Sequence, residues 1–194
     1  MKRMRRMFMM SLLAALCLGL YACATLPKTA SQIETQRADV REMANKTLET
    51  AYQSYPAARS EVQQAAGYAV FSNFGFKFMF MGSSRGAGVV VNNATKRDTF
   101  MKMFELSPGY GFGAQKFACV FIFETRAAME SFVNSGWEFG GNTAAALQTS
   151  TQGVGGRLGV NVAPGVIMYQ LSEGGAIVGI SITGAKYYKD DELN

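Results

Sequence analysis

Few side chains in this sequence are suited to catalysis, because its 194 residues include three cysteines and no histidine. Without imidazole the chain lacks the usual general base, the partner of a nucleophile in catalytic triads and the commonest zinc ligand. No pair of acids stands out for acid–base catalysis, and Asp190, Asp191 and Glu192 are expected in a solvated carboxyl-terminal tail. The sequence therefore predicts a protein that is not an enzyme and that holds no metal or cofactor.

Cys23 is the cysteine whose surroundings predict a modification. Residues 1–6 carry four positive charges and residues 7–20 are almost wholly apolar, which is typical of a secretory signal. This apolar run is shorter than the roughly 20 residues that a transmembrane helix needs. The segment LYAC at residues 20–23 resembles the lipobox of bacterial lipoproteins, whose cysteine is acylated and becomes the new amino terminus. We therefore expect residues 1–22 to be removed and Cys23 to carry lipid. An ordinary cleaved signal and an uncleaved anchor are the alternatives.

The residue after Cys23 bears on the destination of the protein. Ala24 resembles the sorting context of outer-membrane lipoproteins. Two or three acyl chains anchor a protein stably, whereas one gives marginal binding. We therefore expect a lipid-anchored protein of the bacterial cell envelope, in the outer membrane and facing the periplasm. Cys119 would then be the unmodified cysteine, and we expect it to be a small core residue.

The charge balance excludes one class of partner. Residues 1–22 hold four of the 19 lysines and arginines and none of the 14 acids, so the remaining chain has a net charge of +1. A nucleic-acid partner is not indicated by such a balance. The length remaining after cleavage suits one domain with a real core.

The chain is expected to have four parts, which are a signal at 1–22, a tether at 23–30, helices at 31–66 and a glycine-rich β body at 67–194. An apolar stripe that includes Val40, Ala44, Leu48 and Ala51 predicts a first helix. Its start is predicted at Ser31, with a capping box to the glutamate three residues on. Pro56 predicts the first turn of a second helix that ends at Gly67.

Beyond Gly67 the sequence predicts many short strands and one helix at 125–136, with Thr125 as its cap and Gly136 as its stop. The predicted strands are 68–71, 76–81, 87–91, 99–106, 110–114, 116–123, 143–149, 158–162, 166–171 and 176–187. The segment KFACVFIF at 116–123 is apolar in both alternating sets, so that strand is expected between two packed layers. The fold class predicted is α+β, mainly β, with a strongly curved or closed antiparallel sheet and amino-terminal helices packed outside it.

Cations and aromatic residues alternate in two predicted strands. Phe76, Phe78 and Phe80 share one face of a strand, and Phe100 and Phe104 share a face of the next long one. One interpretation is a surface that meets anionic lipid head groups, to which each cation near the surface contributes about 1 kcal/mol. The other is that the aromatic residues fill the sheet interior and the cations lie in solvated loops. The candidate head-group residues are Lys77, Arg85, Lys96, Arg97 and Lys102.

The glycine clusters do not predict a nucleotide site. A phosphate-binding glycine loop leads from a strand into a helix, and a P-loop ends in Gly-Lys-Ser/Thr. The clusters at 109–113 and 153–159 lead into further strand-like sequence and lack that ending. Sheet curvature is the simpler reason for these glycines.

Five segments from residue 65 onward resemble, in order, the blocks of the SYLF domain family. They are AAGYAVFSNFG (65–75), RGAGVVV (85–91), GYGFGAQ (109–115), FGGNTAAA (139–146) and YQLSEGGAIVGISITGAKYY (169–188). The resemblance covers about residues 65–194 and implies a domain that binds lipid, with actin binding in some eukaryotic members and no catalytic activity. Bacterial members are commonly small exported lipoproteins.

The function expected from these observations is that of a membrane-anchored lipoprotein whose SYLF-like domain binds phospholipid through anionic head groups. The alternative is an envelope protein that binds a protein partner and uses lipid as its anchor alone. Steep loss of binding with ionic strength would favour head-group binding by cations. The identity of the lipid, the oligomeric state and the relevance of any actin-like partner stay open.

Overall fold

The computed structural model describes residues 28–139, 159–172, 175–176 and 184–194. The predicted signal segment, Cys23 and the strand predicted at 143–149 lie outside these residues. The chain divides into a unit of residues 1–32 and a unit of residues 33–194, and the architecture below is that of the second unit except for the first turn of helix α2, which lies in the first unit.

Two helices precede the sheet. Helix α2 (Ala30–Ser54) buries Val40, Ala44, Leu48 and Ala51, so the predicted apolar stripe is confirmed. Helix α3 (Pro56–Gln64) begins at the proline, also as predicted. In the part of the chain that the structure describes, none of the helices has the length and apolar character needed to cross a membrane.

The predicted capping box of the first helix is wrong. The Oγ1 of Thr29 accepts a hydrogen bond from the Gln32 N–H at 3.3 Å, and the Gln32 Oε1 accepts one from the Thr29 N–H at 2.8 Å. Thr29, two residues before Ser31, provides the capping hydroxyl, and a glutamine takes the role predicted for the glutamate. The helix therefore begins at Ala30, and Ser31 lies inside its first turn.

The main feature of the sheet is a hairpin of two long strands. Strands β1 (Gly67–Asn92) and β2 (Asp98–Phe123) pair antiparallel along nearly their whole length. Of the breaks predicted between the six short strands, those at 72–75, 82–86, 107–109 and 115 are therefore wrong, whereas the break at 92–98 is the turn between β1 and β2. A Cβ at Gly88 would collide with the Phe71 ring and the Val70 carbonyl oxygen, and one at Gly86 would meet the Ser72 carbonyl oxygen. Glycine thus lets the two halves of β1 pack against each other without ending the strand.

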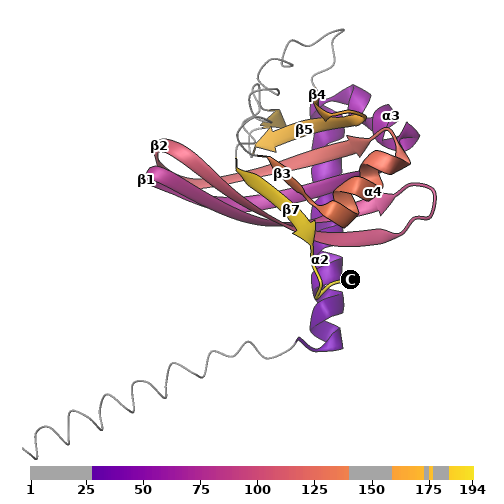
Figure 1. Cartoon of the computed structure of the whole chain (residues 1–194), viewed down its shortest axis with the longest axis horizontal. Helices are drawn as coiled ribbons and strands as arrows, with labels where there is room; N and C mark the ends of the chain where they lie inside the picture. Colours follow the sequence, from indigo (N-terminus) through magenta and orange to yellow (C-terminus); the bar gives the residue numbers. More distant parts are fainter. Residues whose placement is uncertain (1–27, 140–158, 173–174, 177–183) are drawn as a thin grey trace, which may run out of the picture. The chain divides into compact units, whose positions relative to one another are not determined.

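Strand β2 has different partners along its length. Its residues 101–105 pair with β7 (Ala185–Lys189), and its residues 117–123 pair with β5 (Val166–Ser172). The remaining described strands are short and extend this sheet: β3 (Trp137–Phe139) pairs with β7, whereas β4 (Val160–Ala163) and β6 (Gly175–Ala176) pair with β5. The result is a curled antiparallel half-barrel, which confirms the predicted fold class (Figure 1).

Each face of the sheet packs against helices. On the inner face, Cys119, Phe121 and Phe123 join a core that includes Phe132 of helix α4 (Arg126–Ser135). On the other face, Val120 and Ile122 join α2 and α3 in a second core. The prediction that 116–123 lies between two packed layers is therefore confirmed.

Helix α4 begins and ends as predicted. The Thr125 Oγ1 accepts a hydrogen bond from the Ala128 N–H at 3.2 Å, and Gly136 follows the last turn with φ of 65°. A left-handed residue after the last turn favours glycine, because it has no Cβ.

The carboxyl-terminal residues are tied to the sheet, so the prediction of a solvated tail is wrong for Asp190. This carboxylate is buried and lies 2.9 Å from the Lys102 Nζ. The Asn194 side chain donates to the Phe100 carbonyl at 2.7 Å and accepts from the Phe100 N–H at 2.9 Å. These contacts fix the end of the chain along β2.

Candidate functional site

Part of the long hairpin extends beyond the body of the sheet. Among the described residues, 107–116 of β2 pair with β1 alone, from Gly82 opposite Ser107 to Phe74 opposite Lys116. We call residues 74–82 and 107–116 the two-stranded ribbon. Figure 1 shows β1 and β2 running together away from α4, β5 and β7. Among the described elements, no helix lies beside the far end of the ribbon in Figure 1, although Lys116 at its base lines a pocket with residues of α2.

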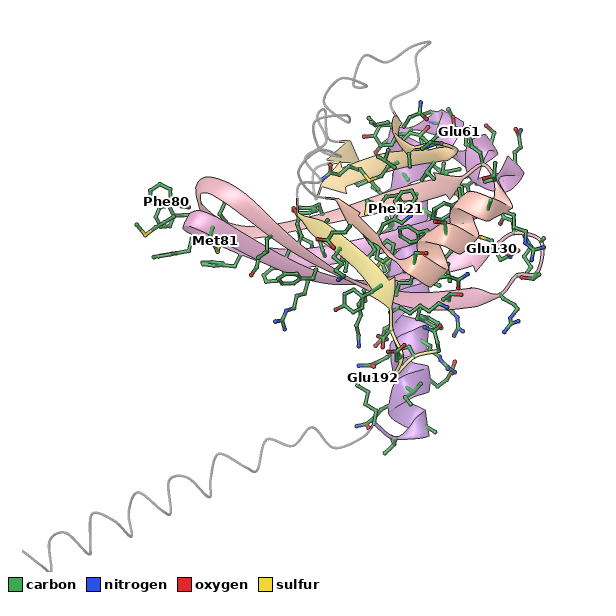
Figure 2. The ribbon with its side chains drawn as sticks, in the orientation of Figure 1. Glu61, Phe80, Met81, Phe121, Glu130 and Glu192 are labelled. Carbon is green, nitrogen blue, oxygen red and sulfur yellow. The ribbon has the colours of Figure 1, made fainter. Side chains whose placement is uncertain are left out.

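The ribbon exposes large apolar side chains. Phe76, Phe78 and Phe80 are 58%, 59% and 67% exposed. Figure 2 shows Phe80 and Met81 at the far end of the ribbon, pointing away from the body. Contiguous exposed apolar surface on a folded domain marks an interaction site. We define the aromatic tip by the exposed residues Phe74, Phe76, Phe78, Met79, Phe80, Met81 and Phe112.

The backbone at the aromatic tip is irregular. The register between β1 and β2 shifts between Met79 and Met81, which leaves Phe80 outside the ladder. Such bulges bend a strand and redirect its side chains. Met79 has a φ of 56°, a left-handed conformation that costs a non-glycine residue on the order of 1–3 kcal/mol. The irregularity puts consecutive apolar residues on the surface where strict alternation would send every second one inward.

The aromatic rings of the two strands also contact each other. The Phe78 and Phe112 ring centroids lie 5.3 Å apart at an interplanar angle of 85°, an edge-to-face pair across the ladder. Aromatic pairs of this geometry contribute about 0.5–1.5 kcal/mol beyond their area burial. The aromatic tip is therefore one continuous surface to which both strands contribute.

The ribbon carries positive charge without acids, since its charged residues are Lys77 and Lys116. Lys77 alternates with the exposed phenylalanines and so shares the inner strand face with Asn73. Its charge lowers the pKa of Glu105, whereas burial of that carboxyl raises the pKa more. Arg85 is exposed just beyond the ribbon, paired with Phe104. A negatively charged surface would therefore meet no repelling side chain on the ribbon.

The structure does not bring the five predicted head-group cations together. Lys77 and Arg85 lie in or beside the ribbon, whereas Lys96 and Arg97 lie in the turn that joins β1 to β2, on the opposite side of the sheet in Figure 1. Lys102 forms the ion pair with Asp190 described above. Two of the five therefore accompany the aromatic tip.

The cations of the turn border a separate pocket of about 490 Å³. Arg41 donates to the Asp98 carboxylate at 2.7 Å, and its guanidinium carbon lies 5.2 Å from the centre of the Phe100 ring. Asp98 raises the pKa of Arg41 through this hydrogen bond. The charge of Arg41 is therefore balanced by Asp98. The cationic residues of the pocket are Arg37, Arg41, Lys96, Arg97 and Lys189.

The structure divides these aromatic residues between the surface and the interior. Phe76, Phe78 and Phe80 lie at the surface, whereas Phe100 is buried and Phe104 is half-buried. Sequence reasoning missed Phe112 and Met81. The signal that could have found Met81 is the run of apolar residues at 78–81, which breaks alternation in a segment without acids. Phe112 joins the tip through its pairing with Phe78 on the other strand.

Cys119 is a core residue, as predicted. It is buried, its Sγ lies 3.9 Å from the Tyr187 hydroxyl, and burial raises the pKa of its thiol to about 12. A thiol with so high a pKa is unreactive at neutral pH. In the described ranges, no three cysteine, aspartate or glutamate side chains converge in a group that could hold a metal ion.

Comparison with known proteins supports the resemblance noted in the sequence. Residues 104–194 match the family model Ysc84, described as Las17-binding protein actin regulator. Residues 104–194 are therefore similar to a Ysc84-type (SYLF) domain. The SYLF match begins within β2, so it includes Phe112 and excludes the β1 side of the ribbon.

A relative extends the likeness to most of the chain. Beta cell expansion factor A of Aeromonas veronii is 33% identical over 174 residues, which are 86% of this chain and 61% of that protein. The chain thus spans less than two thirds of this relative. The match to the SYLF family model supports a domain that binds lipid or a protein such as actin.

Proposed function

We propose that this chain is a bacterial lipoprotein, anchored through Cys23, whose SYLF domain binds phospholipid bilayers without catalysing a reaction. The observation that carries the proposal is the aromatic tip, an exposed apolar surface at the end of a ribbon free of acids. Burying one such side chain contributes about 1.5–3 kcal/mol, so a few inserted phenylalanines suffice for reversible binding.

The cations assist this insertion. Lys77 and Arg85 lie in or beside the ribbon, where each would contribute about 1 kcal/mol with anionic head groups. The contribution of Lys96, Arg97 and Lys102 is smaller, because they lie outside the ribbon and Lys102 already pairs with Asp190. Binding should therefore keep a large apolar part that salt does not screen.

Vesicle sedimentation tests the role of the aromatic tip. The chain from residue 25 onward should pellet with vesicles of phosphatidylcholine and phosphatidylglycerol. The double variant Phe78→Ser/Phe80→Ser should bind about 100-fold more weakly, because two inserted side chains are lost. Tyr188→Ser, which changes an exposed aromatic residue on β7, is the control. Equal pelleting of all three proteins would disprove insertion of the tip.

A fluorescence measurement tests the depth of the tip. In Phe80→Trp, brominated lipids should quench the new indole and shift its emission to the blue. Native Trp137 packs against Phe132 at 5.2 Å between ring centroids and should not respond. An indole at residue 80 that stays unquenched in saturating vesicles would place the tip in water.

The anchor has its own test, because it is independent of the tip. Intact mass of the native protein should correspond to a chain beginning at Cys23 with two or three acyl groups, recovered from the outer membrane. Cys23→Ser should keep the leader and lose the lipid. A native product with an unmodified thiol would remove the anchor from the proposal.

A protein partner is the second candidate, favoured by the description of the family as an actin regulator. In that case the aromatic tip would be a protein interface. Phe78→Ser/Phe80→Ser would then lose the partner, while the unmodified soluble chain would fail to bind vesicles of any composition.

A further inference from the structure

The aromatic tip contains two methionines besides its phenylalanines. Met79 and Met81 are 42% and 68% exposed, and they flank Phe80 where the register between β1 and β2 shifts. Figure 2 shows Met81 beside Phe80 at the far end of the ribbon. Phenylalanine rings resist mild oxidants, whereas the thioether sulfur of methionine is converted to a polar sulfoxide. The tip therefore places two oxidisable sulfur atoms on its apolar surface.

The other methionines among the described residues are shielded. Four of them lie in the core, where their exposed fractions are between 1% and 4%. Met43 of α2 is partly buried, and its sulfur accepts a hydrogen bond from the Thr47 hydroxyl at 3.6 Å. A dissolved oxidant must reach the sulfur atom to react with it, so the two sulfurs of the tip should react first. The four core methionines are Met101, Met103, Met129 and Met168.

We propose that Met79 and Met81 are sites of reversible oxidation by hydrogen peroxide, and that their sulfoxides release the tip from the bilayer. A lone pair of the sulfur forms an S–O bond to one peroxide oxygen while the O–O bond breaks. The second oxygen leaves as hydroxide and takes the proton from the sulfur-bound hydroxyl, so the products are a sulfoxide and water. Sulfur loses two electrons and the peroxide gains them. Methionine sulfoxide reductases reverse the step with a thiol as reductant.

The release follows from the polarity of the sulfoxide, and it rests on the proposed insertion of the tip into a bilayer. The sulfoxide oxygen is a hydrogen-bond acceptor that is hydrated in water and loses those partners in hydrocarbon, which opposes insertion. Because Met79 and Met81 stand on both sides of Phe80, their oxidation makes the end of the tip polar while the rings stay unchanged. Neither side chain belongs to a core cluster, so oxidation should weaken binding without lowering the melting temperature.

Peptide mass spectrometry tests which sulfur atoms react. The chain from residue 25 onward, which contains every described residue, is treated with a limited amount of hydrogen peroxide. Added oxygen should be found on Met79 and Met81 before it is found on any core methionine, and the melting temperature should stay unchanged. Oxygen spread evenly over all the methionines, or found on Met43 alone, would overturn the assignment.

Vesicle sedimentation tests the consequence for binding. The oxidised chain should bind vesicles of phosphatidylcholine and phosphatidylglycerol about tenfold more weakly, and treatment with methionine sulfoxide reductases should restore the binding. Met79→Leu/Met81→Leu keeps the apolar surface without oxidisable sulfur, so it should bind equally well before and after peroxide. Met43→Leu is the matched control, and peroxide should weaken its binding as it does for the unmodified chain.

The outcomes separate this inference from the proposed function. If the chain fails to pellet with vesicles before oxidation, insertion of the tip is wrong and release by oxidation is overturned with it. If the chain pellets and the oxidised chain pellets equally well, this inference alone is overturned. The same holds if Met79→Leu/Met81→Leu loses binding in peroxide as much as the unmodified chain, or if the reductases remove the oxygen without restoring binding.

Discussion

Strands β1 and β2 carry both buried and exposed phenylalanines. Phe71 and Phe121 are 0% exposed where β1 and β2 are covered by other elements, whereas Phe76, Phe78 and Phe80 are 58–67% exposed in the ribbon. Residue type does not separate the two groups. The difference is that α4 and β7 supply packing partners to the first group, and no described element covers the second. The covered group stabilises the fold, and the uncovered group is available to a ligand.

The largest expected effect contrasts one residue from each group. Phe121→Ala should lower the free energy of unfolding by about 3–5 kcal/mol, because it leaves a cavity among Phe71, Phe132 and Tyr187. Phe78→Ala should change it by about 0.5 kcal/mol or less. Urea unfolding of the two variants measures both values. Similar losses would mean that the tip is packed in solution and is no free surface.

The next largest effect on stability concerns the close contact between the two halves of β1. Gly88→Ala should lower the free energy of unfolding by about 1–3 kcal/mol, since the added Cβ collides with the Phe71 ring and the Val70 carbonyl. Ser83→Ala, on an exposed position of the same strand, is the control. Thermal unfolding compares them. A neutral Gly88→Ala would show that the two halves of β1 are not in close contact.

Charge beside the tip should matter less than its apolar surface. Lys77→Met/Arg85→Met should weaken binding to anionic vesicles by about 1 kcal/mol for each cation at low salt. This loss should disappear as ionic strength rises, because salt screens exposed charges. Sedimentation at two salt concentrations separates this effect from that of Phe78→Ser/Phe80→Ser, whose loss should persist. A tip variant whose loss also vanished in salt would assign binding to the cations instead.

The smallest effect concerns Glu105, which is buried with Asn73 and Ser84 at the base of the ribbon. Burial raises the pKa of Glu105 above its ordinary value of 4.5, so the folded chain holds a proton that the unfolded chain has released. Stability should therefore fall as pH rises from about 4.5 through the pKa of the folded state. Glu105→Gln should lack this component. Melting temperatures of both proteins across that pH range give the comparison, and parallel curves would contradict the prediction.

Part of this architecture was predictable because it depends on local chemistry. The stripe of Val40, Ala44 and Leu48 predicts α2, and Thr125 and Gly136 predict the ends of α4. The double apolar alternation of 116–123 predicts a strand covered on both faces. In each case the residues that carry the signal lie within a few positions of one another.

Other features depend on which segments meet in space. The sequence alone was enough to predict the helices, the curled sheet and the alternation of phenylalanines along one strand face. The tertiary structure alone decided that Phe76, Phe78 and Phe80 stay uncovered, that Lys102 pairs with Asp190, and that Asn73, Ser84 and Glu105 share one buried layer. Burial and pairing are set by neighbours far along the chain, and periodicity within one strand carries no information about them.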